Sequence, residues 1–403
     1  MKKTMLCLML VLCLFLAGCG DHAVSNPANP SSDAPMPGYD AQNQYLLLNA
    51  ISFQETEDFF CGSNLLDEFL HFYDKESGIS GVLCTDPACL HDSAECSAYI
   101  QAGSTLSYYD GKIYWIAGEP DSRDGFLWKS DLSGRNREKV KRISFEDIIF
   151  PYQPQRYVIH RGNLYILGQA SVVDDTQTGA RVSLLSLSLS SDEDFTILYD
   201  ETFPHVGQAV VRFMGPSIYL FTPTYRNAGS SDSRVTDLTV MKFDTQSGAS
   251  EVMYQESGLT ERTSDIWVTE TQEFYLSGTT EDTAYLWKLE NNARIELASL
   301  PVEGEAGLTL TGGIAIFTSM KADTRWVEIC DLSGAAIYSG KLFPGAIPGL
   351  DGDPNAYSYG VVGGDAEKLI LMLNSPFSLD ENYTILLDLN NDLEGTVLWS
   401  GQD

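Results

Sequence analysis

The segment Asp110-Gly-Lys-Ile-Tyr-Trp115 decides the fold, because its pattern returns along the chain. A turn of Asp and Gly is followed by a short strand rich in β-branched and aromatic residues. Arg161-Gly-Asn-Leu-Tyr-Ile166 is the clearest second copy. The strand tyrosines at positions 114, 165, 219 and 275 lie 51, 54 and 56 residues apart. Weaker copies begin at Glu57, Gly215, Thr271, Gly312 and Ala366.

A second element accompanies the first and reads Trp128-Lys-Ser-Asp-Leu-Ser-Gly134, a strand that ends in an Asp-led turn. Its other copies are Phe72–Gly78, Lys242–Gly248, Ile329–Gly334 and Leu386–Asn391, with degenerate versions at Leu187–Glu193 and Leu289–Asn292. Counting the copies of both elements indicates seven units.

Units of about 50 residues with several short strands are typical of β-propeller blades. Each blade is a four-stranded sheet that buries its faces against its neighbours. We therefore predict an all-β domain over residues 44–403, a propeller of seven four-stranded blades. A pair of β-sandwiches, or a ring of six or eight blades, stays open as an alternative. The best candidate for a helical turn is Leu65–Tyr73.

The N-terminus has the pattern of an export signal. Lys2 and Lys3 precede an apolar run over Leu6–Leu16, and Ala17 and Gly18 are small residues before Cys19. The run is too short to cross a hydrocarbon core of about 30 Å. Residues 1–18 are therefore predicted to be a signal peptide. The small pair before Cys19 resembles a bacterial lipobox, which implies that Cys19 becomes the first mature residue and carries a lipid. That resemblance implies anchoring to the extracytoplasmic face of a membrane.

Residues 19–43 are predicted to be a disordered tether, since Pro27, Pro30, Pro35 and Pro37 stand among small polar residues with few large apolar side chains. The formal charge of the chain is −31, and loss of the two signal lysines makes the mature chain more negative still. Nucleic acid is therefore not expected as a partner, because its affinity comes largely from Lys and Arg. High net charge also favours a soluble monomer.

The sharpest local motif is the Cys loop, residues 84–96, with the spacing C-x4-C-x-H-x4-C at Cys84, Cys89, His91 and Cys96. Together with Leu83, Pro87, Ala98 and Tyr99, it resembles a signature of Firmicutes-type surface lipoproteins. The repeats resemble the propellers of extracytoplasmic proteins related to the low-density-lipoprotein-receptor β-propeller. Both resemblances imply an architecture; the lipoprotein family has no assigned activity.

Three interpretations of the Cys loop compete. Three thiolates and one imidazole form a ligand set that zinc uses in structural sites. Alternatively, Cys84, Cys89 and Cys96 pair with Cys61 in two disulfides, which an exported protein can form. In the third interpretation, one thiol is reactive or redox-sensing. Cys330 lies in an apolar strand and is predicted to be a buried thiol.

The sequence favours a binding or scaffolding module over an enzyme. It contains neither a Gly-x-Ser-x-Gly elbow nor a phosphate-binding Gly-x4-Gly-Lys-Ser/Thr loop. A rigid propeller presents loops that can recognise a peptide, a glycan or an envelope protein. The alternative is a propeller lyase or hydrolase with acidic residues at the channel mouth, which would require paired carboxylates with raised pKa values.

Overall fold

The computed structural model describes residues 52–63, 68–101, 104–118, 124–144, 157–173, 178–191, 194–226, 236–301, 307–321, 324–376, 378 and 381–401. All of the described residues belong to the second of two units along the chain, Ser32–Asp403. The predicted signal peptide (1–18), Cys19 and the predicted tether (19–43) all lie outside the described residues. Within the described part, no helix is long and apolar enough to span a membrane.

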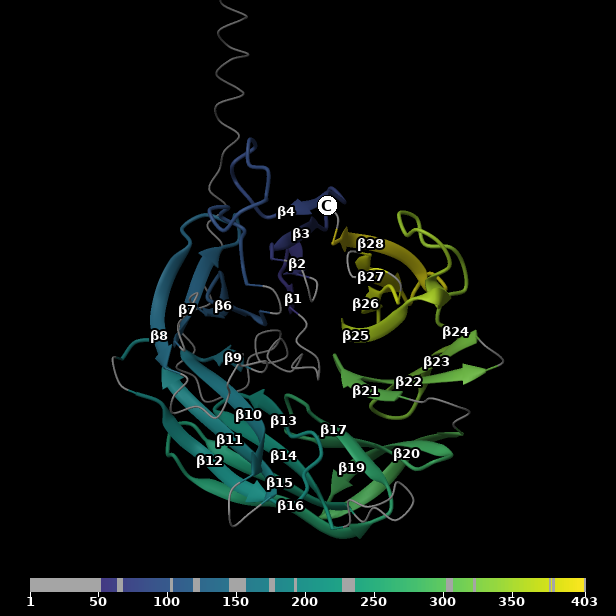
Figure 1. The fold of residues 1–403 in the computed structure, drawn as a ribbon. Coiled ribbons are helices and arrows are strands. Elements are labelled where there is room, and N and C mark those ends of the chain that lie inside the picture. The colour runs from purple at the N-terminus through teal and green to yellow at the C-terminus, as the bar shows by residue number, and fades with distance from the viewer. Residues whose placement is uncertain are drawn as a thin grey trace, which may run out of the picture. The chain divides into compact units, whose positions relative to one another are not determined.

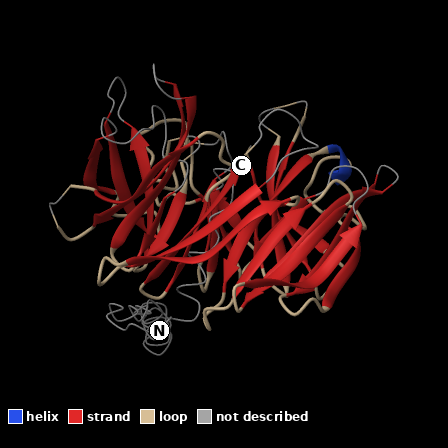
Figure 2. Ribbon diagram, turned by 90° about the horizontal axis from the view of Figure 1, so that it is seen from below, coloured by secondary structure: helices blue, strands red, loops and turns tan. Residues whose placement is uncertain are grey.

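The second unit is a β-propeller of seven four-stranded sheets, which confirms the predicted fold class and blade number. Each sheet uses four consecutive strands, and every pair of neighbouring strands is antiparallel. The sheets follow one another around a common centre (Figure 1). Figure 2 shows strands joined by loops, with one short helix.

The first four blades have the following strands. Blade 1 holds β1 (Ser52–Glu55), β2 (Phe59–Ser63), β3 (His71–Asp74) and β4 (Ser80–Val82). Blade 2 holds β5 (Leu106–Tyr109), β6 (Lys112–Gly118), β7 (Asp124–Asp131) and β8 (Glu138–Ser144). Blade 3 holds β9 (Tyr157–His160), β10 (Asn163–Val173), β11 (Thr178–Ser188) and β12 (Thr196–Phe203). Blade 4 holds β13 (Val210–Met214), β14 (Ser217–Tyr225), β15 (Thr236–Asp244) and β16 (Ser250–Leu259).

The last three blades complete the ring. Blade 5 holds β17 (Arg262–Val268), β18 (Phe274–Thr279), β19 (Thr283–Glu290) and β20 (Ala293–Pro301). Blade 6 holds β21 (Gly307–Thr311), β22 (Ile314–Lys321), β23 (Thr324–Asp331) and β24 (Ala336–Lys341). Blade 7 holds β25 (Ser358–Gly364), β26 (Lys368–Asn374), β27 (Asn382–Asp388) and β28 (Glu394–Ser400), and is preceded by the short 3-10 helix η2 (Pro354–Ala356).

The two sequence elements occupy fixed places in the blades. The first is the turn between the first two strands together with the second strand, as at β5 and β6, where Asp110 and Gly111 have left-handed backbones. The second is the end of the third strand and the turn after it. The carboxylate of Asp131 accepts the backbone N–H of Arg135 at 2.7 Å, and Asp244 accepts that of Ser247 at 2.7 Å. The leading Asp therefore holds this turn closed.

The predicted helical turn at Leu65–Tyr73 is wrong over its described part. Residues 64–67 are not described, and His71–Asp74 form β3. Phe72 pairs with Cys61 of β2 on one side and with Gly81 of β4 on the other. Pairing on both edges of this short segment outweighs its weak local preference for a helix.

Apolar side chains gather between the blades. Of the eight hydrophobic clusters among the described residues, seven each join one blade to the next, including one that joins blade 7 to blade 1. The eighth is small and also joins blades 4 and 5. The core is therefore a ring of interfaces between sheets, as expected when one blade alone cannot bury both of its faces.

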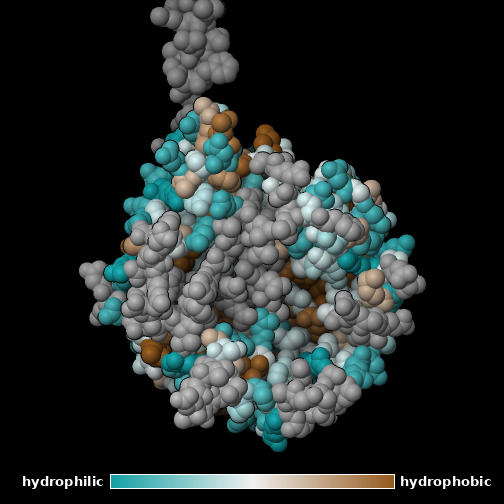
Figure 3. Space-filling model, in the orientation of Figure 1, coloured by the Kyte–Doolittle hydropathy of each residue, from teal (hydrophilic) through white to brown (hydrophobic). Residues whose placement is uncertain are grey.

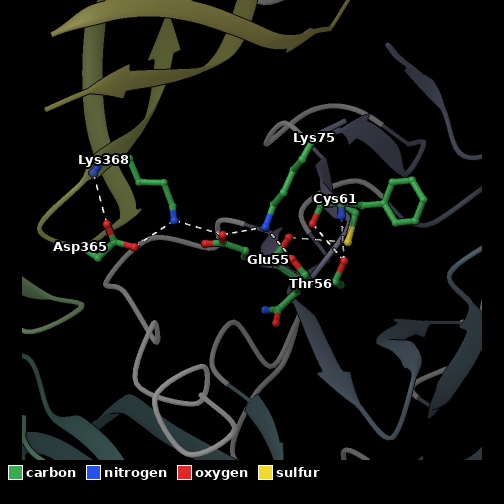
Figure 4. Close-up of polar contacts among 8 residues, drawn as sticks. Glu55, Thr56, Cys61, Lys75, Asp365 and Lys368 are labelled. Carbon is green, nitrogen blue, oxygen red and sulfur yellow. Dashed lines mark hydrogen bonds and ion pairs between the residues drawn. The ribbon is translucent and has the colours of Figure 1, made fainter. Parts of the chain in front are cut away.

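Among the described residues, blades 7 and 1 close the ring through side chains, and their sheets share no strand. Trp399 of β28 stacks on His71 of β3, with ring centroids 6.3 Å apart, and on Phe53 of β1 at 6.2 Å. Glu55 lies between the ammonium groups of Lys75, at 2.8 Å, and Lys368, at 3.1 Å (Figure 4). Burial alone would lower the pKa of Lys368, but its contacts with Asp365 and Glu55 raise it.

Gly134, in the Asp-led turn of blade 2, must be glycine for two reasons. Its φ is +72°, a region that side-chain-bearing residues rarely adopt. A Cβ on Gly134 would also lie 2.2 Å from the carbonyl oxygen of Leu83, the residue after β4. The repeated glycine thus permits the turn and lets blade 2 approach blade 1. Gly334 meets Leu297 in the same way between blades 6 and 5.

Replacing Gly134 with alanine tests this close approach. We expect Gly134→Ala to lower the free energy of unfolding by about 3 kcal/mol, about 1 from the left-handed backbone and about 2 from displacing Leu83. Gly248→Ala is the matched control, because Gly248 has φ +69° but no atom within 4 Å of an added Cβ. Urea unfolding followed by tryptophan fluorescence measures both. Equal losses in the two variants would contradict the role assigned to the contact.

Candidate metal centre

The Cys loop connects the outermost strand of blade 1 to the innermost strand of blade 2. β4 has three residues and is the shortest described strand, so the sheet of blade 1 is small. The chain then returns along blade 1, where Leu70 donates to the carbonyl of Ala98 at 2.9 Å and Ile100 donates to that of Glu68 at 2.7 Å. The loop therefore extends the edge of the smallest blade.

The four predicted ligands come together. The ligand atoms of Cys84, Cys89, His91 and Cys96 all lie within 4.8 Å of one another. Cys96 is buried and the other three residues are half-buried. Nδ1 of His91 lies 3.4 Å from Sγ of Cys96, so this ring nitrogen faces the thiol cluster. The loop thus presents three sulfurs and one nitrogen to a common point.

Local turns aim these side chains inward. Asp86 and Pro87 begin a turn in which Cys89 donates its N–H to the carbonyl of Asp86 at 3.1 Å. The Asp86 side chain also accepts the N–H of Ala88 at 2.9 Å. Pro87 suits this turn because its φ is fixed near the required value. His91, two residues after Cys89, has a left-handed backbone with φ +54°.

The cysteines of the cluster are not paired. Among the residues that the structure describes, Cys61, Cys84, Cys89, Cys96 and Cys330 are all free thiols. A tetrahedral ion with bonds of about 2.3 Å separates its sulfur ligands by roughly 3.8 Å, whereas a disulfide requires about 2.05 Å. A cluster within 4.8 Å therefore has the dimensions that a tetrahedral metal site needs and could hold a metal ion.

The thiols occupy different electrostatic surroundings. Burial raises the pKa of Cys96 to about 12. Burial also acts to raise the pKa of Cys84, but hydrogen bonds, including that of the Ser97 hydroxyl to its Sγ at 3.4 Å, lower the pKa overall. Ser97 therefore stabilises negative charge on the first sulfur of the cluster.

Arg137, from the turn between β7 and β8, fastens the loop to blade 2. Its Nη1 donates to the carbonyls of Ala94 at 3.3 Å and Cys96 at 3.2 Å. The guanidinium lies over the rings of Trp128, 4.7 Å from the centroid, and Tyr99, at 5.6 Å. A positive charge is thus held beside a cluster that becomes anionic when its thiols ionise.

The remaining cysteines lie outside the cluster. Cys61 lies on β2, where burial raises its pKa to about 12 although the charge of Lys75 acts to lower it. Cys330 on β23 is a buried thiol, as predicted, and burial raises its pKa to about 11. Cys19, the predicted lipidation site, is outside the described residues. Sequence reasoning missed Ser97 and Arg137, although Ser97 directly follows a candidate ligand.

An enzymatic alternative requires a pair of neighbouring carboxyl groups with raised pKa values. Among the described carboxyl groups, a raised pKa occurs at Asp265, where burial outweighs the opposing charge of Arg212. Asp265 on β17 and Arg212 on β13 form a buried ion pair at 2.6 Å. The Arg212 Nε also donates to the carbonyl of Ile266 at 2.7 Å. This contact ties blade 4 to blade 5 and is not a pair of neighbouring carboxylates.

No family model and no curated protein matches the sequence. In structure, the chain is similar to a prolyl endopeptidase, with a TM-score of 0.53, 12% identity, and coverage of 93% of this chain and 54% of that one. A puromycin-hydrolysing peptidase of Mycobacterium tuberculosis gives a TM-score of 0.52 at 11% identity, covering 91% of this chain and 55% of that one. An acylaminoacyl peptidase gives 0.50 at 12% identity, covering 87% and 53%. The chain thus spans about half the length of these proteins, and the likeness at this identity concerns the propeller fold alone.

Removing the Arg137 side chain tests its hold on the Cys loop. We expect Arg137→Ala to lower the free energy of unfolding by about 2 kcal/mol, because two carbonyls lose their donor and the aromatic rings lose a stacked cation. Arg135→Ala is the control, since Arg135 is exposed in the same turn. Urea unfolding measures both, and a loss at Arg137 no larger than that at Arg135 would contradict the assignment.

Proposed function

We propose that this protein is a membrane-tethered, extracytoplasmic binding module whose Cys loop is held by a structural zinc ion. The observation that carries the metal assignment is the convergence of Cys84, Cys89, His91 and Cys96 within 4.8 Å. Three sulfurs and one imidazole nitrogen form a complete tetrahedral set for zinc. Four protein ligands leave no coordination position open, which favours a structural role over a catalytic one.

A bound ion would hold the Cys loop in place where the short sheet of blade 1 provides little strand pairing. β4 contributes three residues, and the loop after it is fixed by turns and by a short pairing beside residues 68–70. Zinc bound to all four ligands would close this loop, and its binding free energy would become folding free energy. Ser97 and Arg137 would support the bound state by a hydrogen bond to one sulfur and by a nearby positive charge.

The architecture and the predicted extracytoplasmic location support the proposed binding role. Seven packed blades make a rigid body, and loops on a rigid scaffold are the usual carriers of recognition. Lipid on Cys19 would keep this body at the outer face of a membrane. The ligand would then be a peptide, a glycan or another envelope protein.

Metal analysis with a thiol count tests the zinc site. The sample is the unlipidated chain from Gly20, purified without added metal and without reductant. We expect about one zinc per chain and five thiols that react fully only after unfolding and chelation. Cys84→Ser should lose the metal, whereas Cys330→Ser, on a distant strand, should keep it. Absence of metal together with a single free thiol would overturn the site in favour of two disulfides.

Fractionation of cells tests the anchor. We expect the native protein to sediment with membranes, whereas Cys19→Ala should remain an unprocessed precursor that incorporates no labelled fatty acid. Cys13→Ala, within the predicted signal peptide, is the matched control and should still be lipidated. Equal labelling of the native protein and Cys19→Ala would contradict lipidation at this residue.

A further inference from the structure

The thiols of the Cys loop are close enough to react with one another. The ligand atoms of Cys84, Cys89, His91 and Cys96 lie within 4.8 Å of one another, and the three cysteines are unpaired. A disulfide holds its sulfurs at about 2.05 Å, so a displacement of less than about 3 Å would join two of them. The same cluster could therefore hold a metal ion or form a disulfide, but one pair of sulfurs cannot do both.

Cys84 and Cys89 are the accessible cysteines of the cluster. Both are half-buried, whereas Cys96 is 4% exposed. Leu90, directly after Cys89, is 80% exposed, so solvent reaches this part of the loop. Figure 1 shows the chain after β4 projecting from the rim of the ring, and in Figure 3 the same place is an open surface where hydrophilic and hydrophobic residues adjoin. A small oxidant in water would therefore reach Cys84 and Cys89 before Cys96.

The backbone of Cys96 is also well anchored. Its carbonyl accepts the N–H of Tyr99 at 3.1 Å and Nη1 of Arg137 at 3.2 Å, and the second contact ties it to blade 2. Cys84 and Cys89 stand five residues apart on a segment that forms no strand. These two residues could therefore approach each other without breaking the contact of the loop with blade 2.

Cys61, which packs in the same apolar cluster, is held in a different way. It is 1% exposed and lies on β2, where it pairs with Gln54 of β1 on one side and with Phe72 of β3 on the other. Its Sγ donates to the carbonyl of Gln54 at 3.7 Å. The sheet thus fixes Cys61 on both sides, and its thiol is expected to stay reduced when the Cys loop is oxidised.

We infer that the Cys loop is a redox-sensitive switch, in which a peroxide joins Cys84 to Cys89 and the metal ion is released. This inference rests on the proposed zinc site. One thiolate attacks hydrogen peroxide and becomes a sulfenic acid, with loss of hydroxide. The other thiolate attacks the sulfenic sulfur, which forms the disulfide and expels a second hydroxide. With two protons taken from water, two thiolates and one peroxide give one disulfide and two water molecules: the sulfurs are oxidised and the peroxide oxygens are reduced.

The disulfide would remove half of the ligand set. His91 and Cys96, whose Nδ1 and Sγ lie 3.4 Å apart, would remain, whereas a structural zinc site uses four protein ligands. Because the binding free energy of the ion would be folding free energy, its loss would loosen the loop at the junction of blades 1 and 2. The proposed extracytoplasmic location would expose the loop to oxidants and keep it from the thiol reductants of the cytosol. The oxidised state would then persist until a reductant is supplied.

Titration with hydrogen peroxide tests the switch on the unlipidated chain from Gly20. Zinc is measured before the oxidant is added, and released zinc is followed with a chromogenic chelator. We expect about one zinc released for each peroxide consumed, and a fall from five thiols to three when the unfolded chain is titrated. Peptide mapping should find Cys84 linked to Cys89. Dithiothreitol with added zinc should restore the starting state.

Two histidine variants separate the reacting pair from the ligand set. Cys89→His keeps four ligands but lacks the pair, and it should release zinc at least about tenfold more slowly than the native chain. Cys96→His also keeps four ligands and retains Cys84 and Cys89, so it should release zinc at close to the native rate. If either variant binds no zinc, the disulfide map of the native chain decides alone.

The starting zinc content distinguishes failure of this inference from failure of the proposed function. Zinc absent before oxidation would refute the metal centre and the switch together. Zinc that is present but retained under peroxide would refute the switch alone. The same holds for oxidation without a disulfide, for a disulfide that involves Cys61 or Cys96, and for equal rates of release from the two histidine variants.

Discussion

The structure depends on one constraint, which is that a four-stranded sheet with two apolar faces must have a neighbour on each side. Seven of the eight hydrophobic clusters each occupy one interface between successive blades. None of the sheets shares a strand with another among the described residues, so closure relies on side-chain packing. At the junction of blades 7 and 1, Trp399 and the ion pairs of Glu55 provide that packing.

Blade 1 is the smallest sheet, because its four strands have only three to five residues each. Its interface with blade 2 recruits Cys61, Cys96 and Leu83 into one apolar cluster, against which Cys84 and Cys89 also pack. The Cys loop thus lies where the sheet ends early and where Gly134 brings the next blade into contact. A metal cross-link at this position would stabilise the junction between the smallest sheet and blade 2.

Much of this architecture could be predicted from the sequence, because the repeated elements are local. The Asp-Gly turn before Tyr114 and the Asp-led turn at Asp131 specify where strands begin and end, and their repetition gives the blade number. The four candidate ligands were identified by residue type and spacing alone, and the structure brings them together.

The role of Arg137 and the conformation of β3 could not be predicted, because both depend on contacts between residues far apart in the sequence. Arg137 lies 41 residues from Cys96 in the chain and meets it through the packing of two blades. His71 joins β3 despite a segment that locally suggests a helical turn, because pairing with β2 and β4 decides its conformation.

X-ray absorption at the zinc edge, on protein purified without added metal, would identify the atoms bound to the ion. We expect three zinc–sulfur distances of about 2.3 Å and one zinc–nitrogen distance of about 2.0 Å, with the nitrogen contribution lost in His91→Ala. A zinc signal with oxygen and nitrogen neighbours only, or no zinc at all, would contradict the assignment of Cys84, Cys89, His91 and Cys96 as a metal centre.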